Sequence, residues 1–233
     1  METNDEEIRF AVLNTQILRS PKQTLSTFGT TNIYYYLVSE PAYTEIVNST
    51  ETVIREGKVI AQRPRIVTPY YLSKLEGFST EARKYFDMLL RSHEPHTPGL
   101  FYTYKNEPKE LSIVSDNLSS VVDKLNTEID KRGDPLTSII KGEDALWDVS
   151  LLKFIYELTR GSIKDNVTEM GNLGLLNVDS SGVPADARLR IEGLFRQVEQ
   201  GEMEPAELKA ELDRWGVFEE YQDRFFTIFK KRR

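Results

Sequence analysis

The chain changes character at Asn106-Glu107-Pro108-Lys109-Glu110. Before this stretch, prolines separate short runs of β-branched and aromatic residues, a pattern typical of strands. After it, apolar residues recur at the spacing of amphipathic helices, flanked by residues that favour helix ends. The sequence therefore predicts an α+β fold, with a small, largely antiparallel sheet and one or more helices in the first half and a helical second half.

The first half is expected to supply five or six strands. Residues 8–13 and 33–38 are rich in β-branched and aromatic side chains, and the second run belongs at the centre of the sheet because both its faces are apolar. Residues 52–61 are expected to form a hairpin that turns at Glu56-Gly57. Further elements are expected at residues 65–68 (strand), 101–104 and 111–114 (a second hairpin) and 79–89 (helix).

Several helices are predicted in the second half, at residues 116–132, 143–160, 163–170, 184–200, 205–215 and from 218 onward. Asp116 is expected to cap the first of them, and Gly133 and Gly161 are expected to end the first and second. The predicted domains are residues 1–115 (sheet-containing), 116–172 (helical, packed on the sheet), 173–183 (connector) and 184–233 (C-terminal helical subdomain).

Composition excludes several classes of function. The chain has 233 residues, a formal net charge of −7 and no cysteine, so a disulfide framework and a thiol nucleophile are excluded. This acidic balance opposes nucleic-acid binding, which normally requires a basic surface. The acidic start after Met1 is unlike a signal peptide and no apolar run is long enough to span a membrane, so a cytoplasmic protein is expected.

One candidate metal site is the loop that contains both histidines, His93 and His96. Imidazole nitrogens at this spacing are suitable ligands for a transition metal. However, any further ligand would have to come from elsewhere in a chain without cysteine, so a solvated loop is favoured. We therefore expect no metal and no cofactor.

One stretch has the residue types of a nucleic-acid surface. Arg63 and Arg65 flank a proline, and Tyr70 and Tyr71 follow. Guanidinium groups bind phosphate, and tyrosine rings stack on bases. A sheet rim in which arginine stems cover aromatic rings explains the same pattern.

The final helix carries an aromatic stripe made of Phe218, Tyr221, Phe225 and Phe229. Such a stripe usually packs within its own domain, but a terminal helix is also suited to docking in the groove of a partner or of another copy.

The preferred function is that of a cytoplasmic, non-enzymatic interaction or regulatory protein that binds a protein partner or itself. This interpretation follows from the supply of helical and aromatic surfaces in a chain without a recognisable catalytic or nucleotide-binding motif. Two alternatives stay open: an enzyme whose carboxylates, tyrosines and arginines are brought together only by the fold, and an RNA- or ribosome-associated factor.

Overall fold

The computed structural model describes residues 2–41, 50–74 and 96–231, with side chains between residues 6 and 228. The chain forms two compact units, and each is built from two separate segments. Unit 1 consists of Met1–Arg63 and Tyr102–Asn166, and unit 2 of Pro64–Phe101 and Val167–Arg233. The predicted domain boundaries, which concern segments that fold independently, stay a prediction.

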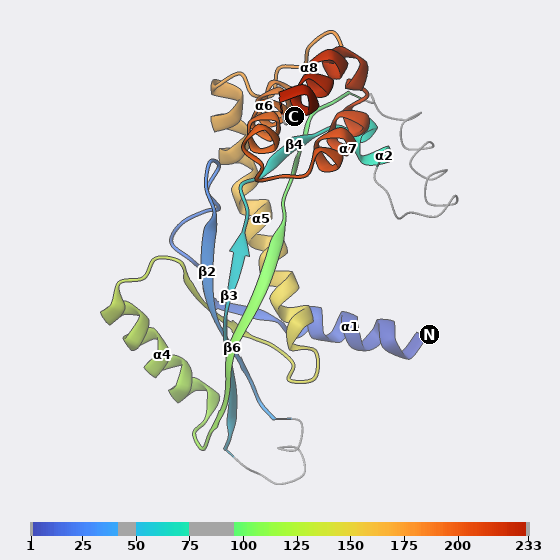
Figure 1. The fold of residues 1–233 in the computed structure, drawn as a ribbon. Helices are drawn as coiled ribbons and strands as arrows, with labels where there is room; N and C mark the ends of the chain where they lie inside the picture. The colour runs from blue at the N-terminus through green and yellow to red at the C-terminus, as the bar shows by residue number, and fades with distance from the viewer. Residues whose placement is uncertain (1, 42–49, 75–95, 232–233) are drawn as a thin grey trace. The chain divides into compact units, whose positions relative to one another are not determined.

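Unit 1 is built on a five-stranded sheet, which confirms the predicted α+β class (Figure 1). Its strand order is β1 (Gln16–Arg19), β7 (Thr137–Lys141), β2 (Thr31–Ser39), β3 (Thr52–Ala61) and β6 (Tyr104–Val114). Neighbouring strands are antiparallel except β2 and β7, which are parallel. The sheet is thus largely antiparallel, as expected from the sequence.

A helix covers each face of this sheet (Figure 1). Alternate side chains of β2 point to opposite faces, so Tyr35 and Leu37 pack with Phe154 of α5 (Trp147–Asn172). Tyr36 and Val38 pack on the other face against α4 (Leu118–Arg132). Burial on both faces explains the continuous apolar run of β2 and confirms its predicted central position.

The strand expected at residues 8–13 is wrong, because α1 (Glu2–Asn14) is a helix. Of its apolar residues, Ala11 is buried, whereas Phe10 is 59% exposed and Leu13 is 74% exposed. A short apolar run does not by itself distinguish a strand from a helix.

Both predicted hairpins are also wrong. β3 runs straight through Gly57, and Tyr35 of the neighbouring strand lies over this glycine, so Gly57 makes room for a ring rather than for a turn. β6 likewise runs through Pro108, which an edge strand tolerates although proline lacks an N–H group. Residues 99–101 form β5 (Gly99–Phe101), which pairs with β4 (Arg65–Val67) in unit 2.

The second half required three smaller corrections. The cap of α4 is Asn117, whose side chain accepts a hydrogen bond from the Ser120 N–H, and not Asp116. Gly161 does not end a helix, since α5 continues to Asn172 and includes the weaker helix predicted at 163–170. Strand β7 was not predicted, because its apolar run is short.

The described part of unit 2 consists mainly of helices, and its buried apolar residues form two clusters. The helices are α2 (Pro69–Ser73), the last turns of α5, α6 (Ala185–Gln200), α7 (Pro205–Trp215) and α8 (Phe218–Lys231). The larger cluster lies among α2, α6, α7 and α8 and buries Ile191, Phe195, Leu212 and Trp215 with other apolar residues. Met170 near the end of α5 packs with Ile66 and Leu175 in the smaller cluster. α6 and α7 end at left-handed glycines, Gly201 and Gly216. α4 ends at left-handed Gly133, which confirms the cap predicted there. The helix predicted at 79–89 lies outside the described residues.

Candidate interaction surface

Strand β6 forms one edge of the sheet in unit 1. β3 pairs with one side of it, and no strand in the described part of the chain pairs with the other side. Such an edge exposes backbone hydrogen-bonding groups that are able to bind another strand. The two halves of β6 differ in how far they resist this pairing.

The first half of β6 is protected. The register shifts between Glu56 and Gly57 of β3, and Pro108 lies opposite Gly57 at this bulge. Charged side chains surround the bulge, where Lys109 lies 3.3 Å from Glu56 and Lys58 lies 3.0 Å from Glu107. Bulges, prolines and lysines all discourage pairing at a free edge.

The second half of β6, residues 110–114, lacks these protections. Its apolar side chains Leu111 and Ile113 are 58% and 52% exposed. They lie opposite Arg55 and Val53 of β3 and therefore point to the face that α5 covers elsewhere. Two large apolar residues at alternate positions of a free edge form the candidate surface, here called the β6 edge (residues 110–114).

The side chain next to Leu111 is held in a fixed position. Arg55 forms an ion pair of 2.6 Å with Asp144, and its guanidinium lies 5.7 Å from the ring centroid of Trp147. Ser39 donates a hydrogen bond of 3.0 Å to the same Asp144 oxygen. Since the side chain of Arg55 is only 15% exposed, this network fixes it as a rigid neighbour of the β6 edge.

A pocket of about 760 Å³ lies on the α4 side of the sheet, beyond the end of that helix. Tyr34 forms part of its wall and is 46% exposed. Hydrogen bonds from Lys105 and Lys58 lower the pKa of Glu107, and Arg132 donates a hydrogen bond of 3.2 Å to the Tyr36 hydroxyl. Charges of both signs line this pocket: Glu56, Lys58, Glu107, Lys109, Arg132 and Asp134.

The arginines and tyrosines considered for nucleic acid have different surroundings. Arg63 lies 5.6 Å from the Phe28 ring in unit 1, and Arg65 lies 5.6 Å from the Phe101 ring in unit 2. Tyr70 packs at a ring distance of 5.6 Å from His96. Tyr71 is buried, so its ring is not available for stacking on a base.

Tyr71 instead belongs to a buried network in unit 2. Its hydroxyl donates a hydrogen bond of 2.9 Å to Glu211, which also accepts one of 3.1 Å from the indole N–H of Trp215. Arg190 forms an ion pair with the same carboxylate. Burial raises the pKa of Tyr71, and the negative charge of Glu211 raises it further. The network joins α2 to α6 and α7, and Tyr71 lies 140 residues from Glu211 in the sequence.

The structure places one of the two candidate metal ligands. His96 lies beside Tyr70 and against Gly182, whereas His93 is outside the described residues. Within residues 2–41, 50–74 and 96–231, no three or more His, Asp or Glu side chains gather as a metal site.

The aromatic stripe of α8 packs inside unit 2. Phe225 is buried in the core cluster, and Phe218 and Tyr221 pack against that cluster. The side chain of Phe229 is not among those described. These contacts favour the core interpretation of the stripe, and they leave Phe226 as its exposed neighbour.

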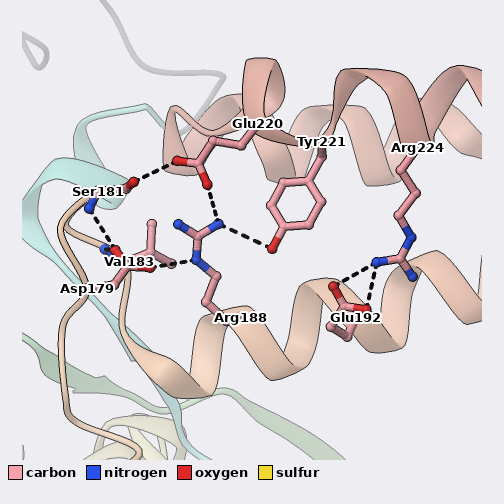
Figure 2. Close-up of polar contacts among 8 residues, drawn as sticks. All are labelled: Asp179, Ser181, Val183, Arg188, Glu192, Glu220, Tyr221 and Arg224. Atoms are coloured by element: carbon pink, nitrogen blue, oxygen red, sulfur yellow. Dashed lines mark hydrogen bonds and ion pairs between the residues drawn. The ribbon is translucent and has the colours of Figure 1, made fainter.

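Ion pairs hold the outer side of α8 to α6 (Figure 2). Arg188 binds Asp179 at 2.7 Å and Glu220 at 2.9 Å, and it donates a hydrogen bond to the Tyr221 hydroxyl. Hydrogen bonds from Ser181 and Arg188 lower the pKa of Glu220. Asp179 lies in the segment predicted as a connector, which is therefore tied to both helices by side-chain contacts.

Comparison of the chain with models of known protein families, with characterised proteins and with solved structures finds no match. In the described part of the chain, no helix is both long enough and apolar enough to cross a membrane.

Proposed function

We propose that this protein is a non-enzymatic interaction protein that binds an extended polypeptide strand along the β6 edge. The observation that carries the proposal is the contrast within one strand. A bulge, Pro108 and ion pairs protect the first half of β6, whereas the second half exposes Leu111 and Ile113. Native proteins protect free sheet edges with such features, so an unprotected apolar half favours a binding role.

The arrangement of side chains defines the strand that fits. Backbone hydrogen bonds supply affinity in strand addition, and alternate side chains supply specificity. The partner would present apolar side chains at every second position, to contact Leu111 and Ile113. Its intervening side chains would face Ser112 and Glu110, so polar residues are favoured there.

The two alternative functions have less support. For the enzyme, the pocket on the α4 side is the candidate site. Its lysines Lys58 and Lys109 lie against glutamates, an arrangement that also serves to protect a sheet edge. For the RNA-associated factor, the buried position of Tyr71 removes one of the two candidate stacking rings. The cytoplasmic location expected from the sequence remains part of the proposal.

The proposal is tested by selecting random nine-residue peptides displayed on phage against the full-length protein. Counter-selection uses a variant in which Leu111→Lys and Ile113→Lys are combined. The enriched peptides should carry apolar residues at every second position, and their binding should weaken at least about tenfold in the double variant.

The matched control combines Leu152→Lys with Tyr156→Lys. These residues are 64% and 67% exposed on α5, so the control adds the same charge to another apolar surface. It should bind the selected peptides as the unmodified protein does. Enrichment without alternation, or equal binding to both double variants, would contradict the proposed function.

A further inference from the structure

We infer that the strand bound by the β6 edge is the same edge of a second copy of this chain, paired antiparallel about a twofold axis at Ser112. The inference rests on the proposed function and names the partner. It follows from the order of side chains in residues 110–114 and from the position of Pro108.

The apolar residues select this register. Directly opposite residues of an antiparallel pair share a face. A shift by one residue would therefore place Leu111 and Ile113 of one copy on one face of the joined sheet and those of the other copy on the opposite face. A twofold axis at Ser112 places Leu111 of each copy opposite Ile113 of the other. An axis at Leu111 or at Ile113 would pair that residue with itself and leave the second apolar residue opposite a polar one.

The protected half of β6 does not obstruct this register. Pro108 would lie opposite Asp116 of the other copy, beyond the end of its strand at Val114. Glu110 would lie opposite Val114, and Lys109 opposite Ser115, so no like charges face each other. The pairing therefore uses the unprotected residues and stops where the protection begins.

Pairing of this kind joins two five-stranded sheets into one continuous sheet. Because both copies use the same surface, the assembly closes as a dimer and does not grow into a fibre. Leu111 of each copy would then contact Ile113 of the other copy on the face next to Arg55.

The lack of cysteine makes a direct test of register feasible. In the variant Ser112→Cys, the two introduced thiols face each other across the axis, and their Cα separation of about 4.5–5.5 Å falls within the range of a disulfide. Mild oxidation with oxidised glutathione should convert most of this variant into a covalent dimer on a non-reducing gel.

The control is Lys105→Cys, an exposed position in the protected half of the same strand. In the proposed register its two copies would be about 45 Å apart, so oxidation should leave this variant monomeric. Equal cross-linking of both variants would indicate random collision and would overturn the register.

Sedimentation tests the assembly itself. The full-length protein should sediment at twice the 26.9 kDa mass of one chain, and Leu111→Lys should raise the dissociation constant at least about tenfold. Leu152→Lys is the control that should leave the dimer intact. A monomer at every concentration would overturn the inference.

The outcomes separate the two proposals. If the chain is monomeric but binds selected peptides in a manner that depends on Leu111, the second copy is excluded and the proposed function stands. If it is monomeric and selects no alternating peptide, both proposals fail. Dimerisation that is insensitive to Leu111→Lys and Ile113→Lys would place the contact elsewhere and overturn the inference.

Discussion

The ring of Tyr35 lies directly over Gly57 on the neighbouring strand, and a Cβ atom added at position 57 would overlap that ring. Tyr35 is one of the largest fully buried side chains of unit 1, and its hydroxyl donates a hydrogen bond of 3.0 Å to Asn106. The glycine is therefore required by packing between β2, β3 and β6.

Gly57→Ala is expected to destabilise the protein by about 1–3 kcal/mol, because the added methyl group forces the buried Tyr35 ring to move. Urea unfolding of the full chain measures the change. Gly161→Ala is the matched control, since Gly161 lies inside α5 with no atom near its missing Cβ. This control should stabilise the protein by about 0.5–1 kcal/mol. A neutral result at position 57 would contradict the packing.

Asn117→Ala is expected to lower the free energy of unfolding by about 1 kcal/mol, because the side chain caps α4 through the Ser120 N–H at 2.9 Å. Thermal unfolding monitored by circular dichroism measures the loss. The neighbouring exposed Ser119→Ala should change stability by less than about 0.5 kcal/mol. Equal effects at both positions would show that the cap contributes nothing.

Tyr71→Phe is expected to destabilise the protein by about 1–2 kcal/mol, because it removes one donor to the buried Glu211 carboxylate. Tyr34→Phe serves as the control, since Tyr34 is 46% exposed and should change stability by less than about 0.5 kcal/mol. Differential scanning calorimetry of both variants decides the question. Indistinguishable melting temperatures would indicate that the network does not stabilise unit 2.

Alkaline pH is expected to destabilise unit 1 through Tyr102. Burial, together with nearby Tyr104, raises the pKa of Tyr102 to about 12 from the ordinary value of 10.0. The folded chain thus holds the phenol proton more tightly than the unfolded chain does. The stabilising effect is complete below pH 10 and is lost as the pH rises through about 12, by at most about 1.4 kcal/mol per pH unit and less because of partial solvent exposure.

Urea unfolding at about pH 9 and about pH 11 measures this loss. Tyr102→Phe should reduce the difference between the two conditions, whereas Tyr156→Phe, at a 67% exposed position, should leave it unchanged. If both variants retain the full pH dependence, Tyr102 is not the group responsible.

The sequence predicted correctly those elements that are marked by a long apolar pattern within their own residues. The stripes and end caps of α4, α6 and α7 identified these helices, and the two-sided apolar run of β2 identified its central position. Local signals failed where a distant residue decides the outcome. Gly57 resembles a turn glycine until Tyr35 is placed over it.

The candidate surface was not visible in the sequence for a related reason. Leu111 and Ile113 alternate with polar residues as in any strand with one buried face, and only the strand order shows that they lie exposed at an edge. The aromatic stripe of α8 gave a stronger local signal, and its contacts place Phe225 in the core. A free edge and its protection are properties of the assembled sheet.

The interleaved composition of the two units has a consequence for synthesis on the ribosome. All of unit 1 has been translated once Asn166 is made. The segment Pro64–Phe101, which belongs to unit 2, lies between the two segments of unit 1 as an insertion. That insertion must wait for Val167–Arg233, which is translated later, before its own unit is complete. The order of translation thus favours folding of the sheet around β6 before the helices of unit 2 assemble.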